Sequence, residues 1–425
     1  MELWHIRGGR RLSGSCRVQG SKNATLPILA ASLALPRRSE LEGVPGLRDV
    51  DAALEILRLL GCRICREGDS VQIDSGGLSG REVPRELMLK MRSSVIFMGA
   101  LLARCGEARL SLPGGCRLGK RPIDLHLMAL RALGAEIREE GDRIECRSRG
   151  LRGAQIRFPF PSVGATENAM LAACGAQGET RIFGAAREPE IVALQDYLCA
   201  LGAEVSGAGT DCIRVGAVRK TASAPFRIPS DRIAAATLAC AVGSAGGSAE
   251  LKNVDPAHFS TVLHCLNQAG CDIITKQRAV TVCAPGRLRA VGPVVTAPYP
   301  GFPTDAQPVL MAALLRAEGD STITETIFEN RYRQVEELRR LGAQIELQGR
   351  RALIHGVERL HAGRLRATDL RGGASMVVAA LSADGETVVA DEGHIRGDEE
   401  RLGKKRAERR QGQLDEFAVD GAGHA

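Results

Sequence analysis

One cysteine of this sequence stands in a setting that favours a reactive thiol. Glycines precede and follow Cys116, which predicts an exposed, mobile loop. Arg117, Lys120 and Arg121 come shortly after it, and nearby positive charge favours the thiolate, the nucleophilic form of cysteine. The other cysteines have no comparable setting. We therefore assign a reactive role to Cys116 alone.

A lysine and an asparagine, Lys22 and Asn23, come shortly before the apolar stretch 26–34, which predicts a helix. At a helix N-terminus, such side chains and the free backbone N–H groups can together bind an anion. The alternative is an ordinary exposed lysine beside a capping serine, Ser21. On this segment alone the alternative is favoured.

A carboxylate, Asp305, follows the proline-rich segment 297–304 and precedes an apolar helix. Aspartate is a common N-cap, so one interpretation of Asp305 is structural. Prolines restrict the backbone, so the same carboxylate could equally be a rigidly held general base. The sequence leaves both interpretations open.

Three arginines, Arg331, Arg371 and Arg396, each lie beside glycine or turn sequence. A single arginine is usually a solvated surface group, but three arginines can converge on one phosphate or carboxylate. In the first half of the chain, Arg121 and Asp124 stand at the start of a predicted helix, where they could bind a ligand. Candidate binding residues therefore occur in both halves.

The elements that position these residues follow a repeat. Five segments share an amphipathic helix, a Leu-Gly-Ala ending or a close variant, and a short apolar strand, and their glycines stand at positions 61, 134, 202, 270 and 342. Glycine at this position predicts a left-handed helix end. The next residue is Ala135, Ala203, Ala343, Cys62 or Cys271, so these two cysteines are predicted to fill the core.

Units of about seventy residues predict three repeats in each half of the chain and thus two similar α/β domains. The Pro- and Gly-containing segment 224–231 is the expected crossover between them, and the strand 11–18 is expected to pair with the second half. A sixth helix is expected near residue 412, but 403–413 contains only one apolar residue, Ala407. The sixth repeat is therefore predicted to be degenerate.

Composition limits the function classes. The chain has 425 residues, 44% of them apolar, and a net charge of +7, which fits an anionic small molecule as well as nucleic acid. Thirteen scattered cysteines, with a single CxxC at Cys62 and Cys65, predict reduced and mostly buried thiols rather than a zinc site. No secretion signal or membrane span is evident, which predicts a soluble, cytosolic protein.

Several stretches resemble those of UDP-N-acetylglucosamine 1-carboxyvinyltransferases, within the enolpyruvyl transferase family. They run in order from the first strand to Ile395, and they are 21–29, 91–94, 112–116, 121–126, 161–166, 186–191, 302–305, 324–331 and 367–371. The resemblance implies two inside-out α/β barrels that close over the substrates. The first barrel would span 22–228 and carry the Cys116 loop, and the second would span 1–21 with 229–425, residues 403–425 being disordered.

The resemblance also implies an addition–elimination reaction in which the enolpyruvyl group of phosphoenolpyruvate passes to the 3-hydroxyl of UDP-N-acetylglucosamine. No metal or redox cofactor is needed. Lys22, Arg121 and Arg396 would hold the phosphate, and Arg331 with Arg371 the carboxylate. Asp305 would be the general base, and Cys116 the acid and the target of fosfomycin. The nucleotide sugar would contact Asn23, Arg92, Asp124, Ser162, Val163, Gly164 and Ile327. The residues Pro122, Ile123 and Leu125 are further substrate-binding residues, together with Lys22, Arg121, Asp305, Arg331 and Arg371.

The C-terminus departs from the family. Relatives read His-Ile-Asp-Arg, whereas this chain reads His394-Ile395-Arg396, and the helical pattern that should follow is lost. One alternative is therefore a paralogue that binds the nucleotide sugar without turnover. A shikimate-type enolpyruvyl transferase is a second alternative because it shares the fold, but the Cys116 loop and the segment 161–164 argue against it. A repeat-built ring around DNA is a third. Seven basic and four acidic residues lie in 396–413, so the rest of the chain is nearly neutral, which disfavours DNA.

Overall fold

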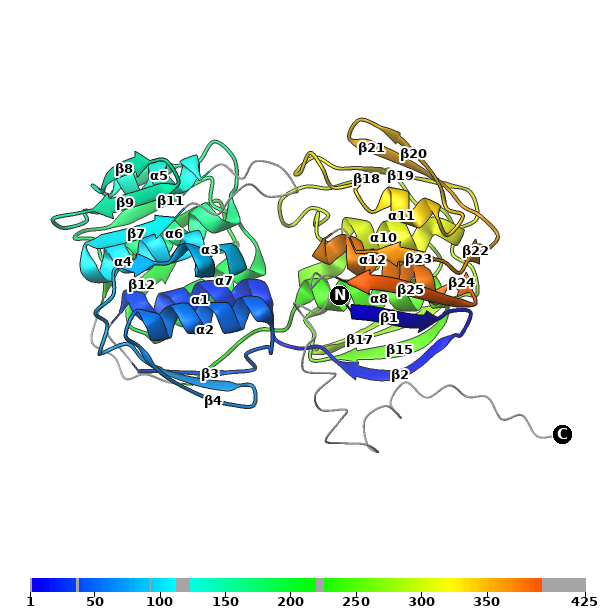
Figure 1. Cartoon of the computed structure of the whole chain (residues 1–425), viewed down its shortest axis with the longest axis horizontal. Coiled ribbons are helices and arrows are strands. Elements are labelled where there is room, and N and C mark those ends of the chain that lie inside the picture. The colour runs from blue at the N-terminus through cyan, green and yellow to red at the C-terminus, as the bar shows by residue number, and fades with distance from the viewer. Residues whose placement is uncertain are drawn as a thin grey trace. The chain divides into compact units, whose positions relative to one another are not determined.

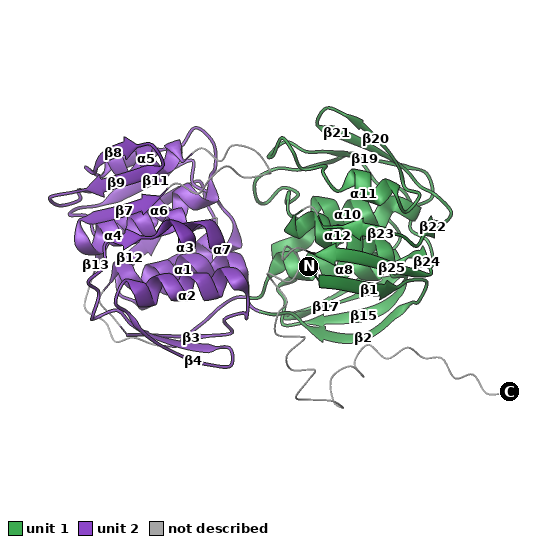
Figure 2. Ribbon diagram, viewed as in Figure 1, with its two compact units in different colours: residues 1–19, 230–425 green, residues 20–229 purple. Residues whose placement is uncertain are grey.

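The computed structural model describes residues 2–35, 38–91, 93–111, 123–218, 225–367 and 369–391. The chain divides into two compact units (Figure 2). One unit is Gly20–Pro229, and the other is Met1–Gln19 together with Ser230–Ala425. We call them the first and the second unit. The second unit is thus made from both ends of the chain.

Three four-stranded sheets belong to the first unit. Their strand orders are β14 (Pro225–Arg227), β3 (Arg38–Glu42), β5 (Ser70–Asp74) and β4 (Arg63–Glu67); β6 (Glu82–Val83), β7 (Glu107–Ser111), β9 (Arg143–Arg147) and β8 (Glu136–Glu140); and β10 (Gln155–Arg157), β11 (Thr180–Phe183), β13 (Cys212–Val218) and β12 (Ala203–Ser206). In each sheet the first pair is parallel and the next two pairs are antiparallel.

The second unit repeats this order twice. Its four-stranded sheets are β2 (Leu12–Arg17), β15 (Gly247–Lys252), β17 (Ala279–Ala284) and β16 (Asp272–Lys276); and β18 (Val294–Val295), β19 (Asp320–Thr324), β21 (Arg351–His355) and β20 (Gln344–Gln348). The expected pairing of the strand at 11–18 with the second half is confirmed, because β2 pairs in parallel with β15.

The sixth sheet differs from the other five in the origin of its third strand. β23 (Arg364–Arg366) pairs in parallel with β25 (Glu386–Asp391), which pairs antiparallel with β1 (Glu2–Arg7). The strands β22 (Leu360–His361) and β24 (Ala383–Asp384), which directly precede β23 and β25 along the chain, form a separate two-stranded parallel sheet. The N-terminal strand therefore completes the sheet of the last repeat, and the predicted sixth helix lies outside the described residues.

Helices lie inside the sheets of each unit (Figure 1). In the first unit α1 (Lys22–Ala34), α4 (Phe97–Cys105) and α6 (Val163–Ala173) pack on one another, and in the second unit α8 (Arg232–Ala245), α10 (Gln307–Ala313) and α12 (Leu370–Leu381) do so. These inner helices are apolar on most sides because they are enclosed on most sides. This is the expected inside-out α/β barrel, present once in each unit.

The remaining helices are amphipathic or short. They are α2 (Arg48–Leu59), α3 (Arg85–Lys90), α5 (Asp124–Ala132), α7 (Pro189–Ala200), α9 (Ser260–Gln268) and α11 (Val335–Arg339), with 3-10 turns η1 (Ser94–Ile96), η2 (Pro256–Phe259) and η3 (Leu314–Arg316). In α2 the buried side chains of Val50, Leu54 and Leu57 recur at helical spacing and face the core. Among the described residues, no helix is long and apolar enough to cross a membrane.

The predicted helix–glycine–strand repeat is confirmed at all five positions. Each glycine has a positive φ, between 91° and 102°, and separates α2 from β4, α5 from β8, α7 from β12, α9 from β16 and α11 from β20. Cys62 and Cys271 are buried, as predicted for core fillers. Burial raises the pKa of the Cys62 thiol to about 11.

The twelve described cysteines are free thiols, as predicted, but fewer are buried than we expected. Six are buried, four are half-buried, and Cys65 and Cys199 are exposed. A cysteine is exposed where its side chain lies on the outward face of a strand or helix. Cys65, for example, lies on the outward face of β4, opposite Gln72 of β5. Within the described ranges of the chain, no group of three His, Cys, Asp or Glu side chains is placed to hold a metal ion.

Two of the repeat glycines provide a matched test of the helix ends. A Cβ added to Gly134 would meet nothing within 4 Å. A Cβ added to Gly61 would lie only 2.6 Å from the carbonyl oxygen of Gly77. Gly134→Ala is expected to destabilise the protein by about 1–2 kcal/mol, through its positive φ alone. Gly61→Ala adds a steric clash and should lower Tm further. Equal Tm shifts for the two variants would contradict this.

Candidate functional site

In the second unit, three of the predicted residues come together. Asp305 precedes α10, Arg331 lies before α11, and Arg371 is in the first turn of α12. An Arg331 Nη lies 2.5 Å from Asp305 Oδ1, and an Arg371 Nη lies 3.1 Å from Asp305 Oδ2. Both guanidinium groups therefore bind one carboxylate, each at its own oxygen.

This geometry decides between the two interpretations of Asp305. The N-cap of α10 is Ala306, whose side chain makes no capping hydrogen bond. The capping interpretation of Asp305 is therefore wrong. The carboxylate is instead 29% exposed, whereas its partner Arg331 is 4% and Arg371 15% exposed. A partly accessible carboxylate between two enclosed cations can exchange a proton with a bound ligand.

Arg331 is fixed by more than Asp305. Its Nε donates to the carbonyl oxygen of Thr304 at 3.3 Å, and its guanidinium lies 5.6 Å from the ring centroid of Phe328. At that separation the cation is attracted by the ring face. Arg371 is placed by Asp369, whose carboxylate caps α12 by accepting from the N–H of Arg371.

A buried glutamate, Glu325, organises the loop that leads to Arg331, and sequence reasoning did not single it out. Its Oε1 accepts from the N–H groups of Ile327 and Phe328 at 2.8 and 3.0 Å, and its Oε2 accepts from the Thr304 hydroxyl at 2.9 Å. It thereby ties the 325–331 loop to the segment that carries Asp305. The exposed side chain of Ile327 lies on this loop. The only sequence signal for Glu325 was its place in the stretch 324–331.

In the first unit, Lys22 and Asn23 are the first two residues of α1, which begins four residues earlier than the apolar stretch indicated. Ser21 is the N-cap of this helix, and its hydroxyl accepts from the Ala24 N–H at 3.2 Å. Lys22 Nζ lies 3.2 Å from Asp49 Oδ2 of α2. The lysine is therefore not an ordinary exposed one: its side chain is 12% exposed and ion-paired.

Two further helix starts in the first unit carry predicted residues. Asp124 is the first residue of α5, after Ile123, and is exposed, whereas Leu125 is buried. Ser162 is the N-cap of α6, and its hydroxyl accepts from the Ala165 N–H. Val163 and Gly164 are the first two residues of that helix. The first N–H groups of a helix have no acceptor within it, so this turn can bind an anion.

Other predicted residues lie outside the described part of the chain. These are Arg92, Cys116, Arg121, Pro122 and Arg396. The 403–425 tail also lies outside it. Their assigned roles stay predictions.

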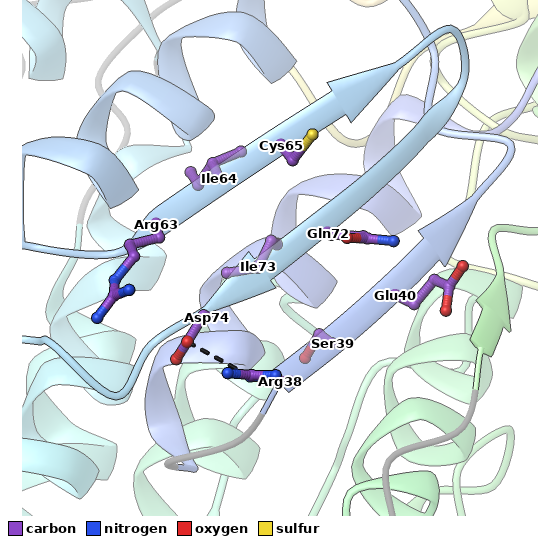
Figure 3. A pocket seen from close by; sticks show the side chains of 9 residues that line it. All are labelled: Arg38, Ser39, Glu40, Arg63, Ile64, Cys65, Gln72, Ile73 and Asp74. Atoms are coloured by element: carbon purple, nitrogen blue, oxygen red, sulfur yellow. Dashed lines mark ion pairs between the residues drawn. The ribbon is translucent and has the colours of Figure 1, made fainter.

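Two surface pockets lie away from the predicted residues. One, of about 480 Å³, lies over β3, β4 and β5, where Arg38 forms an ion pair with Asp74 (Figure 3). The other, of about 510 Å³, lies between α9 and β18. Neither is lined by a predicted site residue. The candidate site therefore rests on the polar groups described above.

Comparison with known proteins gives a consistent result. The family model described as EPSP synthase (3-phosphoshikimate 1-carboxyvinyltransferase) matches residues 6–397. The UDP-N-acetylglucosamine 1-carboxyvinyltransferase 2 of Caldanaerobacter subterraneus is 44% identical over 93% of this chain and 95% of its own length. The UDP-N-acetylglucosamine 1-carboxyvinyltransferase 1 of Symbiobacterium thermophilum is 47% identical over 93% and 90%.

Solved structures show the same fold at lower identity. The enolpyruvyl transferase NikO of Streptomyces tendae aligns with a TM-score of 0.83 at 24% identity, over 96% of both chains. An EPSP synthase of Acinetobacter baumannii aligns with a TM-score of 0.70 at 20% identity, over 92% of this chain and 94% of its own. These structures support the inside-out barrel architecture.

Proposed function

This chain belongs to the EPSP synthase family of carboxyvinyltransferases, and from that membership we propose its reaction. The protein transfers the enolpyruvyl group of phosphoenolpyruvate to the 3-hydroxyl of UDP-N-acetylglucosamine and releases phosphate. The structural observation that carries the proposal is the Asp305 carboxylate held by Arg331 and Arg371. Relatives that are 44% and 47% identical are named for this reaction, which supports the choice of acceptor.

The clamp around Asp305 suggests how the base is released. Arg331 and Arg371 bind the substrate carboxylate, an anion of the same kind as the one they now hold. As that anion becomes their partner, the Asp305 carboxylate gains freedom to accept a proton. Asp305 then takes the proton of the sugar 3-hydroxyl while the oxygen attacks C2 of phosphoenolpyruvate.

The remaining steps follow from proton balance. Addition places a proton on C3 and the sugar oxygen on C2, giving a tetrahedral adduct that still carries phosphate. Elimination removes a proton from C3 and breaks the bond between C2 and the phosphate oxygen, which leaves the enol ether and phosphate. We assign the acid side of this chemistry to Cys116, and binding of the substrate phosphate to Lys22, Arg121 and Arg396.

The nucleotide sugar is assigned to residues of helix starts and loops. The first turn of α6 offers N–H groups for its diphosphate, and Asp124 and Asn23 are polar groups at two other helix starts. The full set assigned to the sugar nucleotide is Asn23, Arg92, Asp124, Ser162, Val163, Gly164 and Ile327. We also assign Pro122, Ile123 and Leu125 to substrate binding. We place the reaction at the first committed step of peptidoglycan synthesis, in the cytoplasm.

The test is phosphate release from phosphoenolpyruvate by the full chain. We expect release that requires UDP-N-acetylglucosamine and stops after treatment with fosfomycin, which alkylates Cys116. Cys116→Ala should leave no alkylated residue in a peptide mass map. Release that depends on shikimate 3-phosphate instead would assign the protein to the other branch of the family. Nucleotide-sugar binding without release would indicate a binding paralogue.

Lys22 gives a further prediction. Its ammonium is enclosed and oriented by Asp49, so Lys22→Gln removes a charged donor to the substrate phosphate. KM for phosphoenolpyruvate is expected to rise roughly tenfold or more, since such bonds contribute about 1.5–3 kcal/mol. Lys90→Gln is the matched control, because Lys90 forms an exposed ion pair with Glu55 in the same unit. An equal change in KM in both variants would argue against Lys22 as a ligand.

A further inference from the structure

A polar network inside the first unit links three segments around a buried asparagine. Asn168 of α6 is fully buried. Its Oδ1 accepts from the Gly99 N–H of α4 at 2.6 Å, and its Nδ2 donates to the Val95 carbonyl oxygen at 3.1 Å. Since a backbone N–H can only donate and a carbonyl can only accept, both ends of the Asn168 amide are assigned unambiguously.

This assignment fixes the tautomer of a neighbouring histidine. Asn168 Nδ2 also lies 3.0 Å from His126 Nδ1, so its second hydrogen points at that nitrogen. Nδ1 must therefore accept, and the ring proton lies on Nε2. Burial lowers the pKa of His126 to about 4, although the carboxylate of Asp124 acts in the opposite direction. His126 is thus a neutral N–H donor near neutral pH.

The donating edge of the ring lies against the first turn of α6. A Cβ built on Gly164 would lie 3.1 Å from His126 Cε1 and 3.3 Å from Nε2. The imidazole edge therefore occupies the side of Gly164 where another residue would place its side chain. This turn follows the Ser162 cap and begins an eleven-residue helix, whose first N–H groups point out of the helix. The Nε2–H thus adds a side-chain donor beside these backbone donors.

We propose that His126 is a specificity-determining residue for the sugar nucleotide: its Nε2–H donates to the diphosphate bound at the first turn of α6, and Asn168 holds the ring in the donating tautomer. The inference rests on the proposed function for the identity of the anion. A neutral donor of fixed tautomer selects a ligand by the position of its acceptor oxygen, because it adds no net charge that would attract any anion.

Two substitutions at His126 separate a donor from a structural contact. The amide nitrogen of glutamine reaches the position of Nε2, so His126→Gln keeps the donor and loses the acceptor for Asn168. Asparagine places its oxygen near the position of Nδ1, so His126→Asn keeps the acceptor and loses the donor. The readouts are Kd for UDP-N-acetylglucosamine and for UDP by calorimetry, KM for phosphoenolpyruvate, and Tm.

The proposal predicts that His126→Asn binds both nucleotides roughly 10- to 100-fold more weakly at nearly unchanged Tm, whereas His126→Gln stays within about threefold of the parent. KM for phosphoenolpyruvate should change little in either variant. The opposite ranking would overturn the proposal. In that case His126→Asn would keep nucleotide binding intact, and only His126→Gln, which leaves Asn168 unsatisfied, would have a lowered Tm. If the unsubstituted protein binds neither nucleotide, the proposed function has failed, independently of His126.

Discussion

Asp305→Asn is expected to release phosphate from phosphoenolpyruvate about 1,000-fold more slowly than the parent protein, because it removes the general base. Asparagine has nearly the same shape as aspartate, so the fold should be retained, but Tm should fall because the enclosed Arg331 loses its anionic partner. The amide carries no charge, so Arg331 and Arg371 lose an anion with which the substrate carboxylate has to compete. KM for phosphoenolpyruvate should therefore stay the same or fall while kcat decreases.

The measurement is steady-state phosphate release at saturating UDP-N-acetylglucosamine, with Tm of both proteins. Asp320→Asn is a suitable control, because Asp320 lies on β19 of the same unit and its carboxylate pairs with His355. A kcat within tenfold of the parent for Asp305→Asn would remove Asp305 from the chemistry. A large rise in KM with unchanged kcat would make it a binding residue only.

Arg331→Gln is expected to raise KM for phosphoenolpyruvate roughly 30-fold and to destabilise the second unit. Arg331 is the more enclosed of the two arginines and binds Asp305, the Thr304 carbonyl and the Phe328 ring together. Removing one partner of a buried ion pair costs about 3–5 kcal/mol. Asp305 retains Arg371 and some solvent, so we expect a loss of about 2 kcal/mol in the free energy of unfolding.

Arg371→Gln provides the comparison within the same clamp. Its side chain is more exposed and its bond to Asp305 is longer, at 3.1 Å, so its effect on stability should be smaller. Arg351→Gln, at an exposed position of β21, controls for the loss of charge. Denaturant unfolding measures the contribution of each arginine to stability, and KM for phosphoenolpyruvate measures its contribution to binding. Equal effects of Arg331→Gln and Arg351→Gln would show that the clamp contributes neither to stability nor to binding.

The sequence by itself determined the repeating elements and the identity of the chemical groups. The helix–glycine–strand order could be predicted because helical spacing and a left-handed glycine are local properties, present within about ten residues. Gly61 and Gly134 illustrate this, since both have the expected positive φ. The stretch that ends in Arg331 was also recognisable, although nothing in it showed which anion that side chain contacts.

The tertiary structure alone decided the contacts between segments distant in the chain. Asp305 meets Arg331 across 26 residues and Arg371 across 66, which turned a possible helix cap into a clamped carboxylate. His126 received its tautomer from Asn168, which is itself oriented by Gly99 of another helix. Strand β1 joined the sixth sheet from the opposite end of the sequence. Such contacts depend on how whole helices and strands pack, and the local periodicity of the sequence does not determine that packing.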